Sequence, residues 1–315
     1  MTEKKKPGKL LIVVAGPTAV GKTELCLQLA QELKTEIISA DSRQFYREMN
    51  IGTAKPSAGE LAAVNHYFIN SHSVAEEYNA GNFEQDALKV IDEIFAKQQA
   101  AILTGGSGLY IRAVTDGMDD MPEVKVGLRA QLQADLETKG LPFLLAQLQL
   151  LDPVYYHQVD RENTQRIIRA LEVCLSSGQP YSSFRVRKSS SPERPFRILK
   201  ICLNRDRNEL YARIDERMDL MLRNGLLDEV KALYPYRHQN ALQTVGYKEL
   251  FEFLDGQYDW KEAVRLLKRN SRRYAKRQLT WFKKDQDYTW FHPEETTAIL
   301  AFIQQHLPDK IKAGT

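Results

Sequence analysis

The segment that most constrains the fold is a glycine-rich stretch directly after a short apolar run. Residues 10–15 (LLIVVA) are continuously apolar and rich in β-branched side chains, which is typical of a central strand in a parallel sheet covered on both faces. The next eight residues fit the pattern GxxxxGK[ST], and Leu25, Leu29 and Leu33 then recur at helical spacing. A strand, a tight loop and a helix in this order predict an α/β sheet with a phosphate-binding loop.

The glycine loop has the composition of a site for phosphate groups. Glycine lets the backbone turn its N–H groups inward around phosphate oxygens, and the start of the following helix adds the positive end of its dipole. Lys22 supplies a mobile positive charge, and Thr23 supplies a hydroxyl for Mg²⁺, the cofactor that we expect. The predicted diphosphate-binding residues are Gly16, Pro17, Thr18, Ala19, Val20, Gly21, Lys22 and Thr23. A tight strand-to-helix turn without a ligand is the alternative interpretation.

Further patterns divide the chain into an α/β core and an insert. The apolar runs 36–40, 100–104 and 197–203 predict more strands of the sheet, and residues 83–98 predict a helix. After about residue 116, strand-like runs give way to leucine-rich helical patterns. We therefore predict a P-loop NTPase-like parallel sheet with helices on both faces in residues 1–115 and 198–315, and an inserted helical subdomain in residues 116–197.

Cysteine usage and hydropathy limit where the protein works. The three cysteines are far apart without CxxC spacing, which argues against a disulfide framework and a zinc site and fits a reducing compartment. No stretch approaches the roughly 18 apolar residues of a membrane span. We expect a cytoplasmic monomer with no membrane partner. The formal net charge of +3 is too small to indicate nucleic acid by itself, so the distribution of charge matters.

The residues that follow two predicted strands indicate which kind of phosphate-binding protein this is. Phosphate-loop NTPases typically carry an acid at the end of an apolar strand, where it holds the water shell of the metal. The strand at 100–104 ends in TGGS, without an acid, whereas the strand at 36–40 ends at Asp41 in the sequence DSRQ. ATP hydrolysis is therefore disfavoured and other phosphate donors are favoured. A small-molecule or nucleoside kinase stays open as the alternative.

Several longer blocks identify a family. They are SADSRQFY (39–46), IGTAKP (51–56), GGSGLY (105–110), RIIRALE (166–172), RIDERM (213–218), VGY (245–247) and RYAKRQLTWF (273–282). Together with the glycine loop, these blocks resemble the bacterial tRNA dimethylallyltransferases, also called tRNA isopentenyl transferases. They occur in family order over roughly residues 10–285. The family more often has Thr where Ser107 stands, and both residues donate a hydroxyl.

The resemblance implies a reaction and roles for particular residues. A dimethylallyl group passes from dimethylallyl diphosphate to the exocyclic N6 amine of the adenosine 3′ of the anticodon in tRNA, and diphosphate leaves. Asp41 is predicted to take the proton of the amine, with capping of the next turn as its alternative role. Arg217 is predicted to stabilise the leaving diphosphate. Ser107 is predicted to hold the Asp41 side or the diphosphate, and Ser42 and Gln44 to read the adenine edge.

A one-sided basic helix predicts an RNA-binding surface. Residues 260–284 contain many lysines and arginines and Glu262 as the only acid, which favours a track for RNA phosphates over an ordinary solvated face. Arg166 and Arg169, one turn apart in the insert, predict a second contact with the anticodon stem-loop, and residues 244–248 are added on the resemblance alone. The predicted tRNA-binding residues are Asp41, Ser42, Arg43, Gln44, Arg129, Gln165, Arg166, Ile167, Ile168, Arg169, Thr244, Gly246, Tyr247, Lys248, Arg269, Arg272, Arg273, Lys276 and Arg277.

Two other functions compete with prenyl transfer. A kinase accounts for the glycine loop and for Asp41 but leaves the basic helix unexplained. An RNA-binding ATPase without chemistry on the base accounts for the helix but not for the missing acid after residues 100–104. Labelled donor incubated with unmodified tRNA separates the three.

Overall fold

A computed structural model describes residues 8–185 and 194–307. The chain divides into two compact units, of which unit 1 combines Met1–Asp116 with Arg194–Thr315 and unit 2 is Gly117–Glu193. In the described residues, no helix is both long and apolar enough to cross a membrane.

The unit boundary lies a few residues earlier than the predicted return to the core at residue 198. Arg194 already belongs to unit 1, because its guanidinium pairs with Glu84 at 2.7 Å and donates to the carbonyl oxygen of Ala113 at 2.9 Å. These contacts hold the returning chain against unit 1 before its next strand begins at Arg197.

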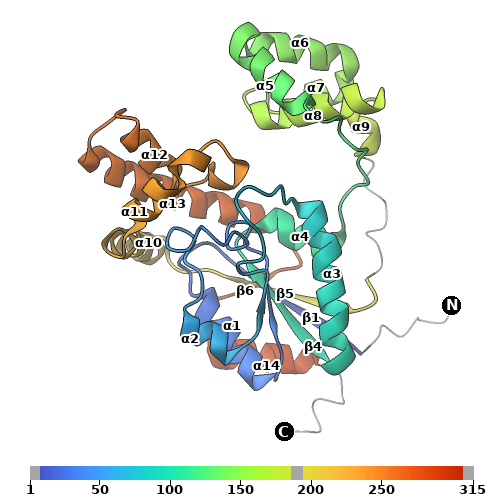
Figure 1. Cartoon of the computed structure of the whole chain (residues 1–315). Coiled ribbons are helices and arrows are strands. Elements are labelled where there is room, and N and C mark those ends of the chain that lie inside the picture. Colours follow the sequence, from blue (N-terminus) through green and yellow to red (C-terminus); the bar gives the residue numbers. More distant parts are fainter. Residues whose placement is uncertain (1–7, 186–193, 308–315) are drawn as a thin grey trace, which may run out of the picture. The chain divides into compact units, whose positions relative to one another are not determined.

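Unit 1 is built on a six-stranded parallel sheet in the order β3-β2-β4-β1-β5-β6 (Figure 1). The strands are β1 (Leu10–Ala15), β2 (Ile37–Ser39), β3 (His66–Tyr67), β4 (Ala100–Gly105), β5 (Arg197–Leu203) and β6 (Thr289–Phe291). Strand β1 lies between β4 and β5 and is buried along its whole length. A strand with no solvent-facing side needs no polar alternation, which explains its continuous apolar run.

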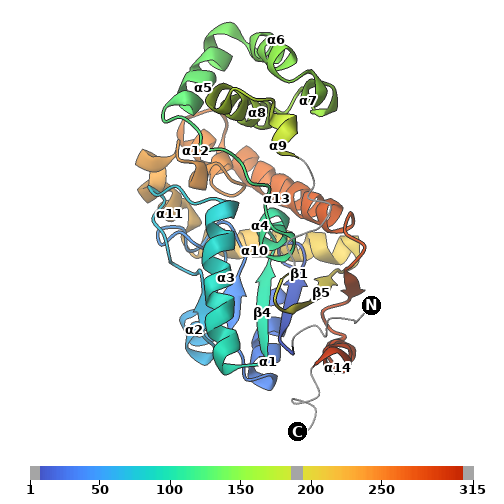
Figure 2. The same ribbon diagram turned by 90° about the vertical axis from the view of Figure 1, so that its right-hand side faces the viewer.

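Helices cover both faces of this sheet (Figures 1 and 2). Alternate residues of a strand point to opposite faces, so Leu11 and Val13 join a core under α3 while Leu10 and Ile12 join one under α1 and α14. The helices of unit 1 are α1 (Lys22–Glu32), α2 (Ala58–Ala63), α3 (Ala80–Lys97), α4 (Gly108–Asp116), α10 (Arg207–Arg223), α11 (Leu226–Leu233), α12 (Lys248–Leu254), α13 (Trp260–Phe282) and α14 (Thr296–His306). The predicted P-loop NTPase-like architecture is confirmed.

Helix boundaries differ from the prediction where a cap decides them. Helix α3 begins at Ala80, three residues before the predicted start, because the Asn79 side chain accepts the N–H groups of Gly81 and Asn82. In unit 1 the sequence reading also missed α2, β3, α4, β6 and α14, which are short or follow no clear periodicity.

Unit 2 is helical, as predicted. Its helices are α5 (Leu128–Lys139), α6 (Leu141–Leu151), α7 (Pro153–Gln158), α8 (Thr164–Ser177) and α9 (Tyr181–Phe184). The leucine-rich stretch forms two helices because Gly140, at φ 80° and ψ 169°, interrupts it. Leu144, Leu148, Ile167 and Ile168 form the centre of a separate core.

Candidate active site

A cavity of about 580 Å³ opens in unit 1 at the carboxyl ends of β1, β2 and β4. This is the edge of a parallel sheet where α/β proteins place ligands. The glycine loop, the segment after β2, α10, residues 244–247 and α13 all contribute to its lining. Lys22, Asp41 and Arg217 therefore line one cavity, although they are far apart in sequence.

The glycine loop wraps tightly and is partly strained. Ala19 has φ 62°, a left-handed conformation that a residue with a Cβ rarely adopts. Lys22 donates from Nζ to the carbonyl oxygens of Gly16 at 3.0 Å and Pro17 at 2.8 Å. Burial lowers the pKa of Lys22 to about 8, with Asp41 raising and Arg217 lowering it to smaller extents. An anion in this loop has a cation beside it that is already partly desolvated.

Three arginines donate hydrogen bonds to the same loop. Arg205 donates from Nε to the carbonyl oxygen of Val20 at 2.9 Å, and Arg213 donates to that of Ala19 at 3.0 Å. Arg217 donates to the Thr18 hydroxyl at 3.3 Å and stays beside the cavity. Arg217 thus lines the cavity next to the loop, and its role toward the diphosphate stays a prediction. Arg205 is a loop contact that sequence reasoning missed.

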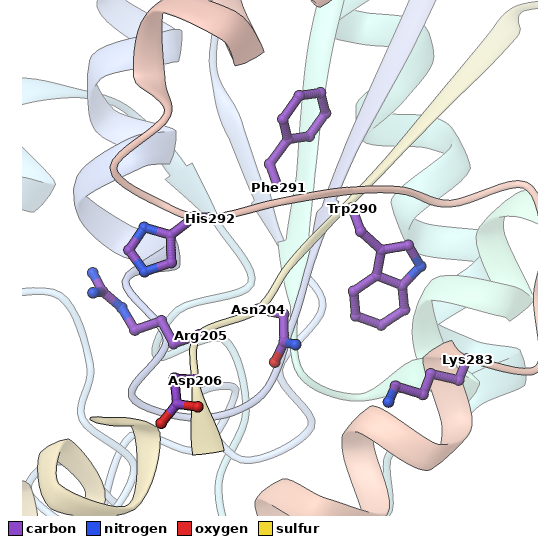
Figure 3. Close-up of a pocket in the computed structure, with 7 residues that line it drawn as sticks. All are labelled: Asn204, Arg205, Asp206, Lys283, Trp290, Phe291 and His292. Atoms are coloured by element: carbon purple, nitrogen blue, oxygen red, sulfur yellow. The ribbon is translucent and has the colours of Figure 1, made fainter. Parts of the chain in front are cut away.

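Arg205 lies in a second, shallow cavity of about 530 Å³ beyond the ends of β5 and β6 (Figure 3). Glu209, His292 and Glu294 bring possible metal ligands within 4.8 Å of one another there. The Arg205 guanidinium, however, already bonds both carboxylates, at 3.0 Å for Glu294. The cluster therefore anchors Arg205 and, through it, Val20 of the glycine loop.

Asp41 and Ser107 are joined through one short loop. Asp41 accepts the backbone N–H of Arg43 on Oδ1 at 3.0 Å, so the capping contact considered above exists alongside exposure to the cavity. Ser107 accepts the N–H of Ser42 at 3.0 Å and donates to the Ser42 hydroxyl at 3.1 Å. Ser107 thus holds the residue next to Asp41, the first of its two predicted roles.

Gln44 is less available than predicted. Its Nε2 donates to the carbonyl oxygens of Thr53 at 3.2 Å and Ala54 at 3.1 Å, and its Oε1 accepts the Ser39 hydroxyl at 3.1 Å. Both ends of the amide are used within the protein. In this structure Gln44 shapes the IGTAKP segment (residues 51–56) and also lines the cavity, and its role of reading an adenine edge stays a prediction.

Glu229 on α11 fixes the start of the IGTAKP segment. Its carboxylate accepts the N–H groups of Asn50, Ile51 and Gly52 at 2.7–3.0 Å and the Tyr247 hydroxyl at 2.6 Å. The Tyr247 ring fills the space where a Cβ on Gly52 would lie, within 2.6 Å. Tyr247 is fully buried, so its predicted contact with tRNA is corrected to support of this segment and the cavity wall.

The other residues near Tyr247 and Asp41 that were predicted to bind tRNA differ in whether they line the cavity. Thr244 and Gly246 line the cavity, and Gly246 needs its glycine because its φ is 102°. Lys248 is exposed at the start of α12, 3.8 Å from Glu252. Arg43 lines the cavity beside Asp41.

The basic helix α13 uses part of its charge internally. Lys268 forms an ion pair with Asp219 of α10 at 2.7 Å, and Arg272 forms one with Asp215 of the same helix at 2.5 Å. The two ion pairs connect α13 to α10. Arg272 is thus already paired within the protein, and its contact with tRNA stays a prediction. Arg269 is half-buried against Asn270. Among the exposed residues of α13, Arg273, Lys276 and Arg277 form no ion pair with any described residue.

Helix α13 also supplies residues that were not predicted. Tyr274 lines the cavity, and burial together with the Asp41 carboxylate raises the pKa of its phenol to about 12, so the phenol stays protonated. Gln278 lines the cavity and contacts both Thr18 and Gly106. The RYAKRQLTWF block contains both residues, but only its charges were read as functional.

In unit 2, the predicted RNA contacts separate by burial. Ile167 and Ile168 lie in the core of the unit, which corrects their assignment as contact residues. Arg129 pairs with the buried Glu172 at 3.1 Å and bonds Gln165 at 2.7 Å. Arg166 is exposed, and Arg169 lies 3.5 Å from Glu172. Gln165 and Arg166 are exposed and Arg169 is partly exposed, so the contact of these three side chains with tRNA stays a prediction.

The residues around the loop suit a magnesium ion bound mainly by phosphate and water. Thr23 is exposed in the first turn of α1, lines the cavity, and forms no side-chain hydrogen bond with a described residue. At the end of β4, Thr104 donates its hydroxyl to the carbonyl oxygen of Val14 at 2.9 Å, in the place where an NTPase has its acid. The single protein hydroxyl is compatible with Mg²⁺, which keeps several waters.

Comparison with known proteins gives one consistent result. The family model described as IPP transferase matches residues 44–285. The chain is 52% identical over 284 residues to tRNA dimethylallyltransferase 2 of Porphyromonas gingivalis, covering 90% of this chain and 94% of that protein. It is 50% identical over 287 residues to the tRNA dimethylallyltransferase of Christiangramia forsetii, with coverage of 91% and 94%.

Solved structures agree. The tRNA isopentenylpyrophosphate transferase of Bacillus halodurans matches with a TM-score of 0.70 at 37% identity, covering 98% of this chain and 99% of that one. A eukaryotic dimethylallyltransferase acting on tRNA matches with a TM-score of 0.71 at 29% identity, covering 87% and 69%.

Proposed function

The chain belongs to the IPP transferase family, that of the tRNA dimethylallyltransferases, and from this premise we propose a specific reaction for it. It transfers a dimethylallyl group from dimethylallyl diphosphate to the exocyclic N6 amine of the adenosine 3′ of the anticodon in tRNA. Its partners are the anticodon stem-loop and the donor, and it acts as a monomer in the cytoplasm.

One observation carries the proposal: a carboxylate and a diphosphate-type loop line the same cavity. Asp41, Lys22 and Arg217 all line it. The amine nitrogen attacks C1 of the donor, the N–C1 bond forms as the C1–O bond breaks, and diphosphate leaves. The amine proton passes to the Asp41 carboxylate, whose Oδ1 is oriented by the Arg43 N–H.

The leaving diphosphate gathers negative charge as the C1–O bond breaks. Lys22, Arg217 and the inward N–H groups of the loop stabilise that charge, and they act in a desolvated site where electrostatic interactions are strong. Thr23 would hold Mg²⁺, which supplies further neutralisation of the diphosphate.

A kinase is not favoured. The family matches are tRNA-modifying transferases, and Thr104 stands where a metal-holding acid is expected. The exposed Arg273, Lys276 and Arg277 on α13 suit RNA phosphates and have no use in small-molecule phosphorylation.

The test is direct. The protein is incubated with Mg²⁺, dimethylallyl diphosphate labelled in its prenyl group, and unmodified tRNA. Label in the RNA together with an equal amount of free diphosphate supports the proposal, and nuclease mapping should place the label 3′ of the anticodon. Unlabelled RNA, or ADP formed from added ATP and a phosphorylated product, would overturn it.

A further inference from the structure

Gln278 connects two active-site loops through one buried amide. Its side chain is only 7% exposed and lies near the C-terminal end of α13. Oε1 accepts the backbone N–H of Thr18 at 3.0 Å, and Nε2 donates to the carbonyl oxygen of Gly106 at 2.9 Å. Thr18 belongs to the glycine loop and Gly106 to the turn after β4, so the amide bridges the two.

The turn after β4 is shaped to receive this amide. A Cβ on Gly106 would lie 2.2 Å from Gln278 Nε2, far inside any real contact, and the next nearest heavy atoms are at 3.4 Å and beyond. The absence of a side chain at position 106 therefore makes room for Gln278. Gly108 does the same for the Trp281 ring, which would meet a Cβ at 2.1 Å.

The bridge continues to the proposed base. Ser107 follows Gly106 and bonds both the backbone N–H and the hydroxyl of Ser42, the residue after Asp41. A chain of hydrogen bonds thus runs from Thr18 through Gln278 and the turn after β4 to the loop that carries Asp41. These contacts set how far the diphosphate loop lies from the carboxylate.

We propose that Gln278 is a positioning residue for prenyl transfer: it fixes the glycine loop against the turn after β4, so that donor and amine are held at reacting distance. The inference rests on the proposed function. Misplacement of reacting groups by about 1 Å costs on the order of 10²-fold in rate. Gln278 acts on the geometry of both loops and needs no contact with either substrate.

The first experiment replaces Gln278 by methionine, which keeps the volume and removes both hydrogen bonds. We expect kcat for prenyl transfer to fall roughly 10- to 100-fold, with affinity for the anticodon stem-loop within about twofold of the parent protein. Thr280→Val, an exposed position on the same helix, serves as the control and should keep the parent kcat. A Gln278→Met kcat within twofold of the parent value overturns the proposal. So does a parallel loss of kcat and RNA affinity with a lower urea midpoint, since that pattern marks a structural role.

A double-mutant cycle tests the contact itself. Gly106→Ala alone drives a methyl group into Nε2 and should lower kcat at least tenfold, about 1.4 kcal/mol. In a Gln278→Ala background the obstruction is gone, so Gly106→Ala should change kcat less than twofold from that background. Equal effects of Gly106→Ala in both backgrounds refute the bridge. Because the parent protein is assayed in parallel, failure of prenyl transfer itself appears as no label in the RNA for any variant.

Discussion

Replacing Glu229 by glutamine tests how the IGTAKP segment is held. Each carboxylate oxygen accepts two hydrogen bonds: Oε2 from the N–H groups of Asn50 and Ile51, and Oε1 from the N–H of Gly52 and the hydroxyl of Tyr247. In Glu229→Gln one oxygen becomes an NH₂ group. Placed at the Oε2 position, the NH₂ faces the N–H groups of Asn50 and Ile51, and both of those hydrogen bonds are lost. Placed at the Oε1 position, it loses the N–H of Gly52 but donates to the Tyr247 hydroxyl, which can also accept. The amide should take the second orientation, which leaves one buried donor unpaired.

The size of the stability loss follows from the number of backbone N–H groups left without an acceptor. Leaving a buried donor unpaired costs about 1–3 kcal/mol. Residues 50–52 are partly accessible to water, which favours the lower half of that range. With one donor unpaired, we expect Glu229→Gln to lower the free energy of unfolding of unit 1 by about 1–2 kcal/mol. Tyr247→Phe removes one hydrogen bond to the same carboxylate and should cost about 1.5 kcal/mol.

Tryptophan fluorescence in urea measures this loss in the right part of the molecule, because Trp260, Trp281 and Trp290 all lie in unit 1. Asp228→Asn on the same helix is the matched control; its ion pair with Lys231 is exposed and should be worth well under about 1 kcal/mol. A Glu229→Gln protein as stable as the Asp228→Asn protein would refute the reasoning, since the four contacts would then contribute nothing net.

Three further outcomes are expected. Asp41→Asn keeps an acceptor for the Arg43 N–H but removes the base, so kcat should fall about 10²- to 10⁴-fold. Affinity for the anticodon stem-loop, measured by filter binding, should stay within about twofold, and equal losses of kcat and affinity would show that Asp41 only caps the turn. Lys22 is protonated below its pKa of about 8 and loses its charge as the pH rises above that value. The affinity for diphosphate, measured by calorimetry, should therefore weaken between about pH 7.5 and 9.5 more steeply in the parent protein than in Lys22→Met. Parallel curves of affinity against pH for the two proteins would contradict this. Neutralising Lys276 and Arg277 by glutamine should reduce the slope of log K against log salt for RNA binding by about 0.7–0.9 per lost contact, whereas Arg265→Gln, which removes a partner of Glu262, should leave it unchanged.

The sequence pattern predicted those elements whose conformation depends on residues close to them in the chain. The β1 run and the glycine loop lie within one continuous segment, and their strand, turn and helix signals depend on near neighbours only. The family blocks then located Asp41 and Arg217, which the fold brings to one cavity, and Ser107, which bonds the residue after Asp41.

What the sequence could not supply were partners distant along the chain. Gln278 bonds a residue 260 positions earlier, and Glu229 holds amides about 180 positions earlier, so no spacing rule reveals either contact. Burial was the other gap. Ile167 and Ile168 were included with a block of matching residues, although their apolar side chains fit the core face of α8 better than an RNA surface.

Pairing of β1 with β5 has a consequence for synthesis of the chain. All six residues of β1 pair with β5, yet the whole of unit 2 is encoded between the N-terminal strands and β5. At about 5–20 residues per second, the ribosome takes roughly 4–15 s to add residues 117–193, and β1 keeps one apolar edge unpaired during that time. The nascent protein therefore presents a template for wrong strand pairing, and a chaperone that binds extended apolar segments should crosslink to residues 10–15 only until β5 emerges.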